Sequence, residues 1–236
     1  MFSFKFFNVE DDASSQKVGN DAVLVGAWAP SIHVSEPSHI LDIGTGCGVV
    51  ALMMAQRFPM ARVHGVDLDM PSIREAARNF EASAWGERMD VFCSPLQEFE
   101  TELRYQVIVS NPPFFTNSLK GPNAQRNTAR HTDTLPFEDL LEHVARLLAP
   151  DGTFSCMLPN LDADNVVRKA RLHYNLNLHA RLDIRTRVDL PVKRSLLAFT
   201  PRVPERVDIR ELVLRDADNR NSEPHKSLTR DFYLNS

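Results

Sequence analysis

Short apolar runs alternate along the chain with longer stretches in which apolar residues recur every three or four positions. Such runs are typical of strands buried inside a sheet, and such stretches are typical of the helices that cover it. The runs predict strands near residues 39–43, 62–66, 89–93, 105–110, 153–158, 182–188 and 195–200. The periodic stretches predict helices near residues 20–29, 48–58, 71–83, 137–149 and 161–174. This alternation predicts an α/β protein with a mainly parallel sheet and helices on both faces.

Composition narrows the class of protein further. The 236 residues fit one large domain or two small ones, and 43% apolar residues are enough for a sizeable core. No apolar run approaches the roughly 18 residues of a membrane span, and the first residues lack the pattern of a secretory signal. Cys47, Cys93 and Cys156 are widely spaced, which favours neither a disulfide framework nor a zinc site. We therefore expect a cytoplasmic protein with no membrane segment and no metal.

A glycine-rich segment follows the first predicted strand of the sheet. It reads Asp42-Ile43-Gly44-Thr45-Gly46-Cys47-Gly48, and a helical pattern comes directly after it. A strand, a glycine-rich turn and a helix form the usual context of a nucleotide site, because glycine lets the backbone approach a ligand closely. The next strand delivers Asp67 roughly 20 residues further on, where a carboxylate can accept both ribose hydroxyls. The alternative is a tight turn with an unrelated acid at a strand end.

The glycine spacing indicates which nucleotide fits. Dinucleotide folds usually have Gly-x-Gly-x-x-Gly, with the pyrophosphate at the helix N-terminus. Here the spacing is Gly44-x-Gly46-x-Gly48, with Asp42 just before it. An acid at that point repels a pyrophosphate and attracts an ammonium group. The segment therefore favours S-adenosylmethionine, which carries an α-amino group and no phosphate, over a nicotinamide cofactor.

A second motif, Asn111-Pro112-Pro113-Phe114, follows the predicted strand at 105–110. The Asn111 amide offers an acceptor oxygen and two donor hydrogens, and the prolines offer carbonyl oxygens only. The ring of Phe114 can stack on a planar base. This combination suits the binding of a flat amino or amide nitrogen, so Asn111, Pro112 and Phe114 are the candidate catalytic residues. The alternative is a proline-rich turn that only ends a strand.

In this order, the motifs resemble those of class I S-adenosylmethionine-dependent amino-group methyltransferases. Two terminal segments resemble the bacterial valine-tRNA adenine-37 N6-methyltransferases in particular, so the likeness runs from about Phe4 to Leu234. These segments are Lys17-Val18-Gly19-Asn20-Asp21-Ala22-Val23-Leu24-Val25-Gly26-Ala27-Trp28 and Leu228-Thr229-Arg230-Asp231-Phe232-Tyr233-Leu234. Asn20 and Ala22 stand where the family pattern has Thr and Gly.

The resemblance implies one Rossmann-like methyltransferase domain over residues 1–236, with seven strands of which the last is antiparallel. Residues 1–35 would form a cofactor lid segment, and residues 36–236 the sheet and its covering helices. The motifs and the resemblance together give these S-adenosylmethionine-binding residues: Lys17, Gly19, Asp21, Asp42, Gly44, Gly46, Gly48, Asp67, Leu68, Leu96 and Asn111. The family often has an Asp for the adenine amino group where this chain has Pro95, so we expect the Leu96 backbone to make that contact.

The charge distribution points to an RNA partner although the formal net charge is −4. Residues 117–131 follow the Phe114 motif and contain basic residues and no acid. We expect an exposed loop here whose Lys120, Arg126 and Arg130 bind RNA phosphates. Residues 165–206 also hold ten Lys or Arg against three acids. Ordinary solvated surface is the alternative for both stretches.

The expected activity is N6-methylation of an adenine in tRNA. The family likeness alone points to A37 of valine tRNA, in the anticodon loop, with no obligate protein partner. Guanine N2-methylation of ribosomal RNA and glutamine N5-methylation of a protein remain alternatives, because the Asn-Pro-Pro-aromatic motif serves those reactions too. A nicotinamide oxidoreductase or an inactive RNA-binding protein would belong to a different class.

Overall fold

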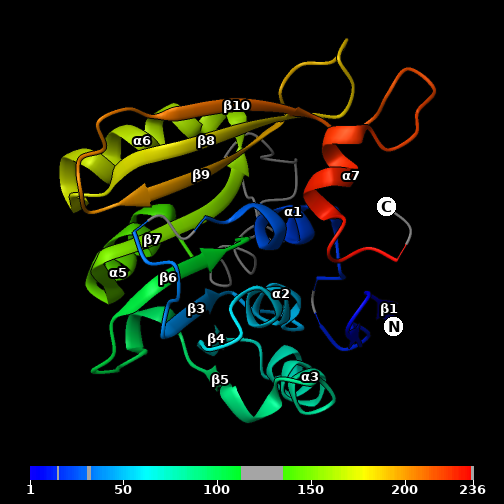
Figure 1. Ribbon diagram of the computed structural model, residues 1–236. Coiled ribbons are helices and arrows are strands. Elements are labelled where there is room, and N and C mark those ends of the chain that lie inside the picture. Colours follow the sequence, from blue (N-terminus) through cyan, green and yellow to red (C-terminus); the bar gives the residue numbers. More distant parts are fainter. Residues whose placement is uncertain (15, 31–32, 113–134, 235–236) are drawn as a thin grey trace, which may run out of the picture.

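The computed structural model describes residues 1–14, 16–30, 33–112 and 135–234. Its centre is an eight-stranded sheet with the order β10-β8-β9-β7-β6-β3-β4-β5 (Figure 1). The strands are β3 (His39–Ile43), β4 (Arg62–Asp67), β5 (Met89–Cys93), β6 (Tyr105–Ser110), β7 (Leu148–Pro159), β8 (Asn177–Arg185), β9 (Arg194–Thr200) and β10 (Asp208–Val213). Neighbouring strands are parallel except at β9, which is antiparallel to both β7 and β8.

The predicted fold class is confirmed, with one addition to the sheet. All seven expected strands are present, and the seventh, β9, is the antiparallel one. An eighth strand, β10, extends the sheet by pairing in parallel with β8. The sequence did not predict β10, because Asp208–Val213 is an edge strand that mixes charged and apolar residues. Two boundaries also differ, since β7 begins at Leu148 and β8 spans Asn177–Arg185.

Helices cover both faces of the sheet (Figure 1). They are α1 (Asn20–Trp28), α2 (Val49–Arg57), α3 (Met70–Glu81), α5 (Phe137–Leu147), α6 (Asn160–Tyr174) and α7 (Glu223–Thr229), with 3-10 turns η1 (Gly86–Arg88) and η2 (Leu96–Glu98). Alternate strand residues point to opposite faces. Ile40 of β3 joins one apolar cluster with residues of α1, α2 and α3, and Leu41 joins a second with α5 and α6. No helix of the described ranges is both long and apolar enough to cross a bilayer.

Helix α1 is not amphipathic, because the five residues from Ala22 to Gly26 are all buried. A Cβ at Gly26 would lie 2.5 Å from the sulfur of Met53, so only glycine allows α1 and α2 to approach this closely. Whether the 1–35 segment also covers a ligand remains a prediction.

The two terminal segments lie side by side. Strands β1 (Phe2–Ser3) and β2 (Asn8–Val9) form a separate antiparallel pair. The rings of Phe4 and Tyr233 stack with centroids 6.1 Å apart, and the Lys5 N–H donates to the carbonyl oxygen of Phe232 at 2.9 Å. The Tyr233 hydroxyl also donates to Oδ1 of Asn20 at 3.3 Å, so the two segments that carry the most specific sequence likeness contact each other.

Candidate functional site

The three main sequence motifs meet at one edge of the sheet. In the parallel register, Ile43 of β3 is opposite Val66 of β4 and Ser110 of β6, so the carboxyl ends of these strands coincide. The Ser110 hydroxyl donates to the Ile43 carbonyl oxygen at 2.9 Å, and the Gly44 N–H donates to the Val66 carbonyl oxygen at 2.8 Å. The glycine turn, Asp67 and Asn111 follow these strand ends directly. Ligands in open α/β sheets bind at such an edge.

The three glycines of the turn have different tasks. Their φ angles are 70° at Gly44, 54° at Gly46 and 84° at Gly48, which other residues rarely adopt. A Cβ at Gly44 or Gly46 would meet no atom within 4 Å, so open space faces both. A Cβ at Gly48 would lie 2.4 Å from Cε1 of Phe80 on α3. Gly44 and Gly46 thus leave room for a ligand, whereas Gly48 allows the turn to pack on α3.

This difference predicts different effects for two alanine variants. Gly46→Ala should cost about 1–2 kcal/mol of unfolding free energy, for the left-handed backbone alone, and should weaken cofactor binding. Gly48→Ala adds an overlap with Phe80 and should cost roughly 3 kcal/mol or more. Urea unfolding measures both, and calorimetric titration with S-adenosylhomocysteine measures binding. Equal losses of stability in the two variants would contradict this division.

Asp42 is buried and belongs to the interior of the turn, with 1% of its surface exposed. Its Oδ2 accepts hydrogen bonds from the Thr45 hydroxyl at 2.8 Å and from the Ala51 N–H of α2 at 3.1 Å. Burial, with a smaller contribution from the nearby charge of Asp67, raises the pKa of Asp42 to about 7 against the effect of these two hydrogen bonds. In this structure the carboxyl holds the turn to the first turn of α2, and the direct cofactor contact expected from the sequence remains a prediction.

The raised pKa of Asp42 predicts a pH-dependent stability. Because the pKa is higher in the folded protein than its ordinary value of 3.8, folding favours the neutral carboxyl, and stability falls as the pH rises from about 4 to about 7. One pKa unit corresponds to about 1.4 kcal/mol, so the loss approaches 4 kcal/mol as an order of magnitude. Asp42→Asn should remove this slope, because an amide does not titrate, and its side-chain oxygen can keep both hydrogen bonds. Urea unfolding at pH 5 and pH 8 is the test, with exposed Glu102→Gln as the matched control. A slope unchanged in Asp42→Asn would contradict the assignment.

Asp67 lies half-exposed at the end of β4, beside the open face of the turn. Its Oδ2 accepts from the Gly46 N–H at 2.9 Å, and its Oδ1 accepts from the Asp69 N–H at 3.0 Å. These bonds fix the orientation of the carboxylate while leaving it further acceptor capacity for hydroxyl groups. Leu68 is 52% exposed next to it and offers an apolar surface to a planar ring.

The loop after β5 reaches the same edge. The Ser94 N–H donates to the Asp67 carbonyl oxygen at 2.9 Å. Pro95 is exposed and precedes η2, and the Leu96 side chain is only 5% exposed in the core. Any contact of Leu96 with a ligand at this edge would therefore come from its backbone. That this backbone binds the adenine amino group stays a prediction.

Asn111 carries a buried and unpaired acceptor. Its Oδ1 is buried and has no hydrogen-bond partner among the described residues, and Pro112 beside it is buried as well. A buried acceptor without a partner costs stability, so the arrangement fits a site where a ligand supplies the missing donor. Phe114 and the expected RNA-binding residues Lys120, Arg126 and Arg130 lie outside the described residues.

The expected lid residues pair with other parts of the protein. Lys17 donates through Nζ to the carbonyl oxygens of Asp11 and Asp12, and Gly19 precedes α1. Asp21 forms an ion pair with Arg194 at 2.5 Å, at the point where β9 begins beside the end of β7. Sequence reasoning missed Arg194, because only the antiparallel return of β9 brings it to this edge.

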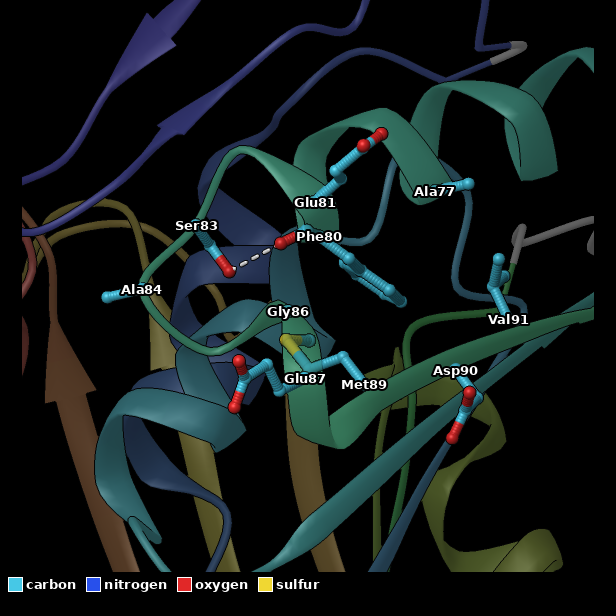
Figure 2. A pocket seen from close by; sticks show the side chains of 10 residues that line it. All are labelled: Ala77, Phe80, Glu81, Ser83, Ala84, Gly86, Glu87, Met89, Asp90 and Val91. Atoms are coloured by element: carbon cyan, nitrogen blue, oxygen red, sulfur yellow. Dashed lines mark hydrogen bonds between the residues drawn. The ribbon is translucent and has the colours of Figure 1, made fainter.

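A cavity of about 600 Å³ lies at a different place, between α3, η1 and the start of β5 (Figure 2). Glu81, Glu87 and Asp90 line it together with apolar residues. These residues flank the amino end of β5, whereas the motifs flank the carboxyl ends of the strands. The cavity is thus not the site to which the sequence motifs lead.

Solved structures of methyltransferases have the same fold as this protein. A "predicted O-methyltransferase" from Agrobacterium tumefaciens matches with a TM-score of 0.66 and 15% identity over 89% of this chain and 96% of its own. A "putative RNA methyltransferase" from Pyrococcus horikoshii matches with a TM-score of 0.51 and 15% identity, over 72% of this chain and 77% of its own. The fold is that of the class I methyltransferases.

Comparison of sequences gives the family. The protein-family model described as "Methyltransferase small domain" matches residues 27–158. The chain is 42% identical to a tRNA1(Val) (adenine(37)-N6)-methyltransferase of Bacteroides fragilis strain YCH46, over 99% of this chain and 97% of that protein. It is 41% identical to the protein of the same name from Edwardsiella ictaluri, over 99% and 93%. The chain belongs to this family of S-adenosylmethionine-dependent enzymes.

Proposed function

We propose that this protein transfers the methyl group of S-adenosylmethionine to N6 of adenine 37 in valine tRNA. Family membership over nearly the full chain supports this assignment. The observation that carries the mechanism is the buried, unpaired Oδ1 of Asn111 at the edge where the glycine turn and Asp67 lie.

Open space, a carboxylate acceptor and an apolar side chain at this edge support S-adenosylmethionine as the ligand. The open space before Gly44 and Gly46 admits the methionine end, and Asp67 can accept the ribose hydroxyls. Exposed Leu68 can cover one face of the adenine ring. When bound, this cofactor supplies a methyl group made electrophilic by a sulfonium centre.

Asn111 and Pro112 would bind the amino group of the substrate. The Asn111 Oδ1 and the Pro112 carbonyl oxygen each accept one N–H of an adenine, while Phe114 stacks on the base. Two acceptors draw the nitrogen toward tetrahedral geometry, which frees its lone pair for attack. Alignment of this kind can be worth roughly 7–11 kcal/mol. The nitrogen becomes acidic on methylation and loses its proton afterwards, so we assign no general base.

The substrate would present its base at low cost. An anticodon-loop adenine is already unpaired, so little energy is spent on moving it into the pocket. We propose that the basic residues of 117–131 bind the phosphates of that loop. Residues 1–35 would cover the cofactor within the single domain. The protein would act in the cytoplasm, where tRNA is modified.

Mass spectrometry of nucleosides tests the proposed function. Purified protein, S-adenosylmethionine and unmodified valine tRNA should yield N6-methyladenosine at position 37, and tRNA with A37 replaced by another base should yield none. N2-methylguanosine as the product would overturn the proposal in favour of a guanine methyltransferase. If the methyl group of S-adenosylmethionine is labelled, a product label that protease removes and ribonuclease does not would overturn it in favour of a glutamine methyltransferase.

A further inference from the structure

Helix α3 presents two buried polar side chains to the N-terminal segment of the chain. Glu75 is 1% exposed and Asn79 is 3% exposed. The Glu75 Oε1 accepts from the Ala13 N–H at 2.8 Å, and Oε2 accepts from the Ser14 N–H at 2.8 Å and from the Ser14 hydroxyl at 2.5 Å. Among the described residues, the donors bonded to this carboxylate thus come from two consecutive residues outside any helix or strand.

Asn79 joins the same segment to the glycine turn. Its Oδ1 accepts from the Glu10 N–H at 2.9 Å, and its Nδ2 donates to the Glu10 carbonyl oxygen at 2.8 Å. The same Nδ2 also donates to the Cys47 carbonyl oxygen at 2.8 Å. One side-chain amide therefore binds both the N-terminal segment and the turn that carries Gly44 and Gly46.

The segment is also closed on itself. The Val18 N–H donates to Oδ2 of Asp11 at 3.0 Å, so Asp11 lies beside the residue that precedes Gly19 and α1. Burial alone would raise the pKa of Glu75, but the hydrogen bonds from Ala13 and Ser14, with the charge of Arg78, bring it below its usual value. The carboxylate is therefore ionised at neutral pH, and its hydrogen bonds to the loop are charge-assisted.

We propose that Glu75 and Asn79 are positioning residues that fix residues 10–14 against the glycine turn and thereby set the affinity for S-adenosylmethionine. The physical reason is preorganisation, because a ligand that must first order this loop binds more weakly than one that finds it ordered. This inference rests on the proposed function, since it assumes that the cofactor occupies the space before Gly44 and Gly46.

Glu75→Gln tests the proposal. The glutamine NH₂ would face one backbone N–H donor, that of Ala13 or that of Ser14, and the carboxylate charge would be lost, so the loop should detach from α3. We expect Kd for S-adenosylhomocysteine and KM for S-adenosylmethionine to rise roughly tenfold, since hydrogen bonds to charged groups are worth that much. The KM for tRNA and the kcat at saturating cofactor should stay within about twofold. Glu81→Gln, an exposed carboxylate on the same helix, is the matched control and should change none of these.

The outcomes distinguish the positioning role of Glu75 from the proposed function. If the parental protein fails to bind S-adenosylhomocysteine, the proposed function fails. If the parental protein binds it and Glu75→Gln binds equally well, while hydrogen exchange shows the amides of residues 13 and 14 released, the positioning role is wrong. Should Glu75→Gln not fold, Ser14→Ala decides, because it removes one donor and keeps the carboxylate. Its Kd should rise about threefold, and an unchanged Kd would overturn the inference.

Discussion

Asn111→Ala is expected to lower kcat by roughly 10²–10³-fold, the range found when one preorganised hydrogen-bonding group is removed from a reaction site. The variant loses the acceptor that holds the attacking nitrogen, so the amino group stays planar and misaligned. The Kd for S-adenosylmethionine should change little, because Asp67 and the glycine turn are untouched. Single-turnover methylation of valine tRNA measures the rate, and calorimetric titration measures the affinity.

Stability provides an internal check on the same variant. Since no described residue donates to the Asn111 Oδ1, its removal should not lower the free energy of unfolding by more than a small amount. Asn177→Ala is the matched control, because Asn177 is buried at the other end of the sheet and donates to the Pro201 carbonyl oxygen. That control should lose stability and keep kcat. A parental rate in Asn111→Ala would remove Asn111 from the reaction.

Asp67→Ala is expected to weaken S-adenosylmethionine binding by about 1.5–3 kcal/mol, which is roughly 10- to 150-fold in Kd. The variant loses the acceptor for the ribose hydroxyls and also the acceptor of the Gly46 N–H, so the turn itself loosens. Asp67→Asn keeps one oxygen and should lie between the variant and the parent.

Calorimetric titration with S-adenosylhomocysteine gives the three Kd values directly. At saturating cofactor, kcat of Asp67→Ala should approach the parental value, because the carboxylate does not touch the reacting nitrogen. Equal Kd values for parent and Asp67→Ala would exclude Asp67 from the cofactor site.

Much of the fold follows from the apolar pattern, and the exceptions have physical causes. Buried strands such as Val107–Val109 are recognisable because both faces of the sheet are covered. Strand β10 escaped prediction because an edge strand needs no continuous apolar run, and Ile209 within it is 64% exposed. Helix α7 was not predicted either, because it is too short to show a periodic apolar pattern. Its start is marked only locally, where the Ser222 side chain accepts from the His225 N–H.

The site divides in the same way. Parallel strands bring their carboxyl ends together, so the glycine turn, Asp67 and Asn111 were predictable as neighbours from their order in the chain. Glu75, Asn79 and Arg194 were not, because each acts on a segment far away in sequence. Asp42 was singled out for its charge, yet its burial and its bonds to Thr45 and Ala51 appear only in three dimensions.

The most direct test of the central claim is a crystal structure of this protein with S-adenosylhomocysteine. We expect the ribose hydroxyls to donate to the Asp67 carboxylate and the amino-acid end to lie against Gly44 and Gly46. We expect the sulfur to face the Asn111 amide. A ligand whose sulfur points away from Asn111, or one bound in the cavity between α3 and β5, would contradict it.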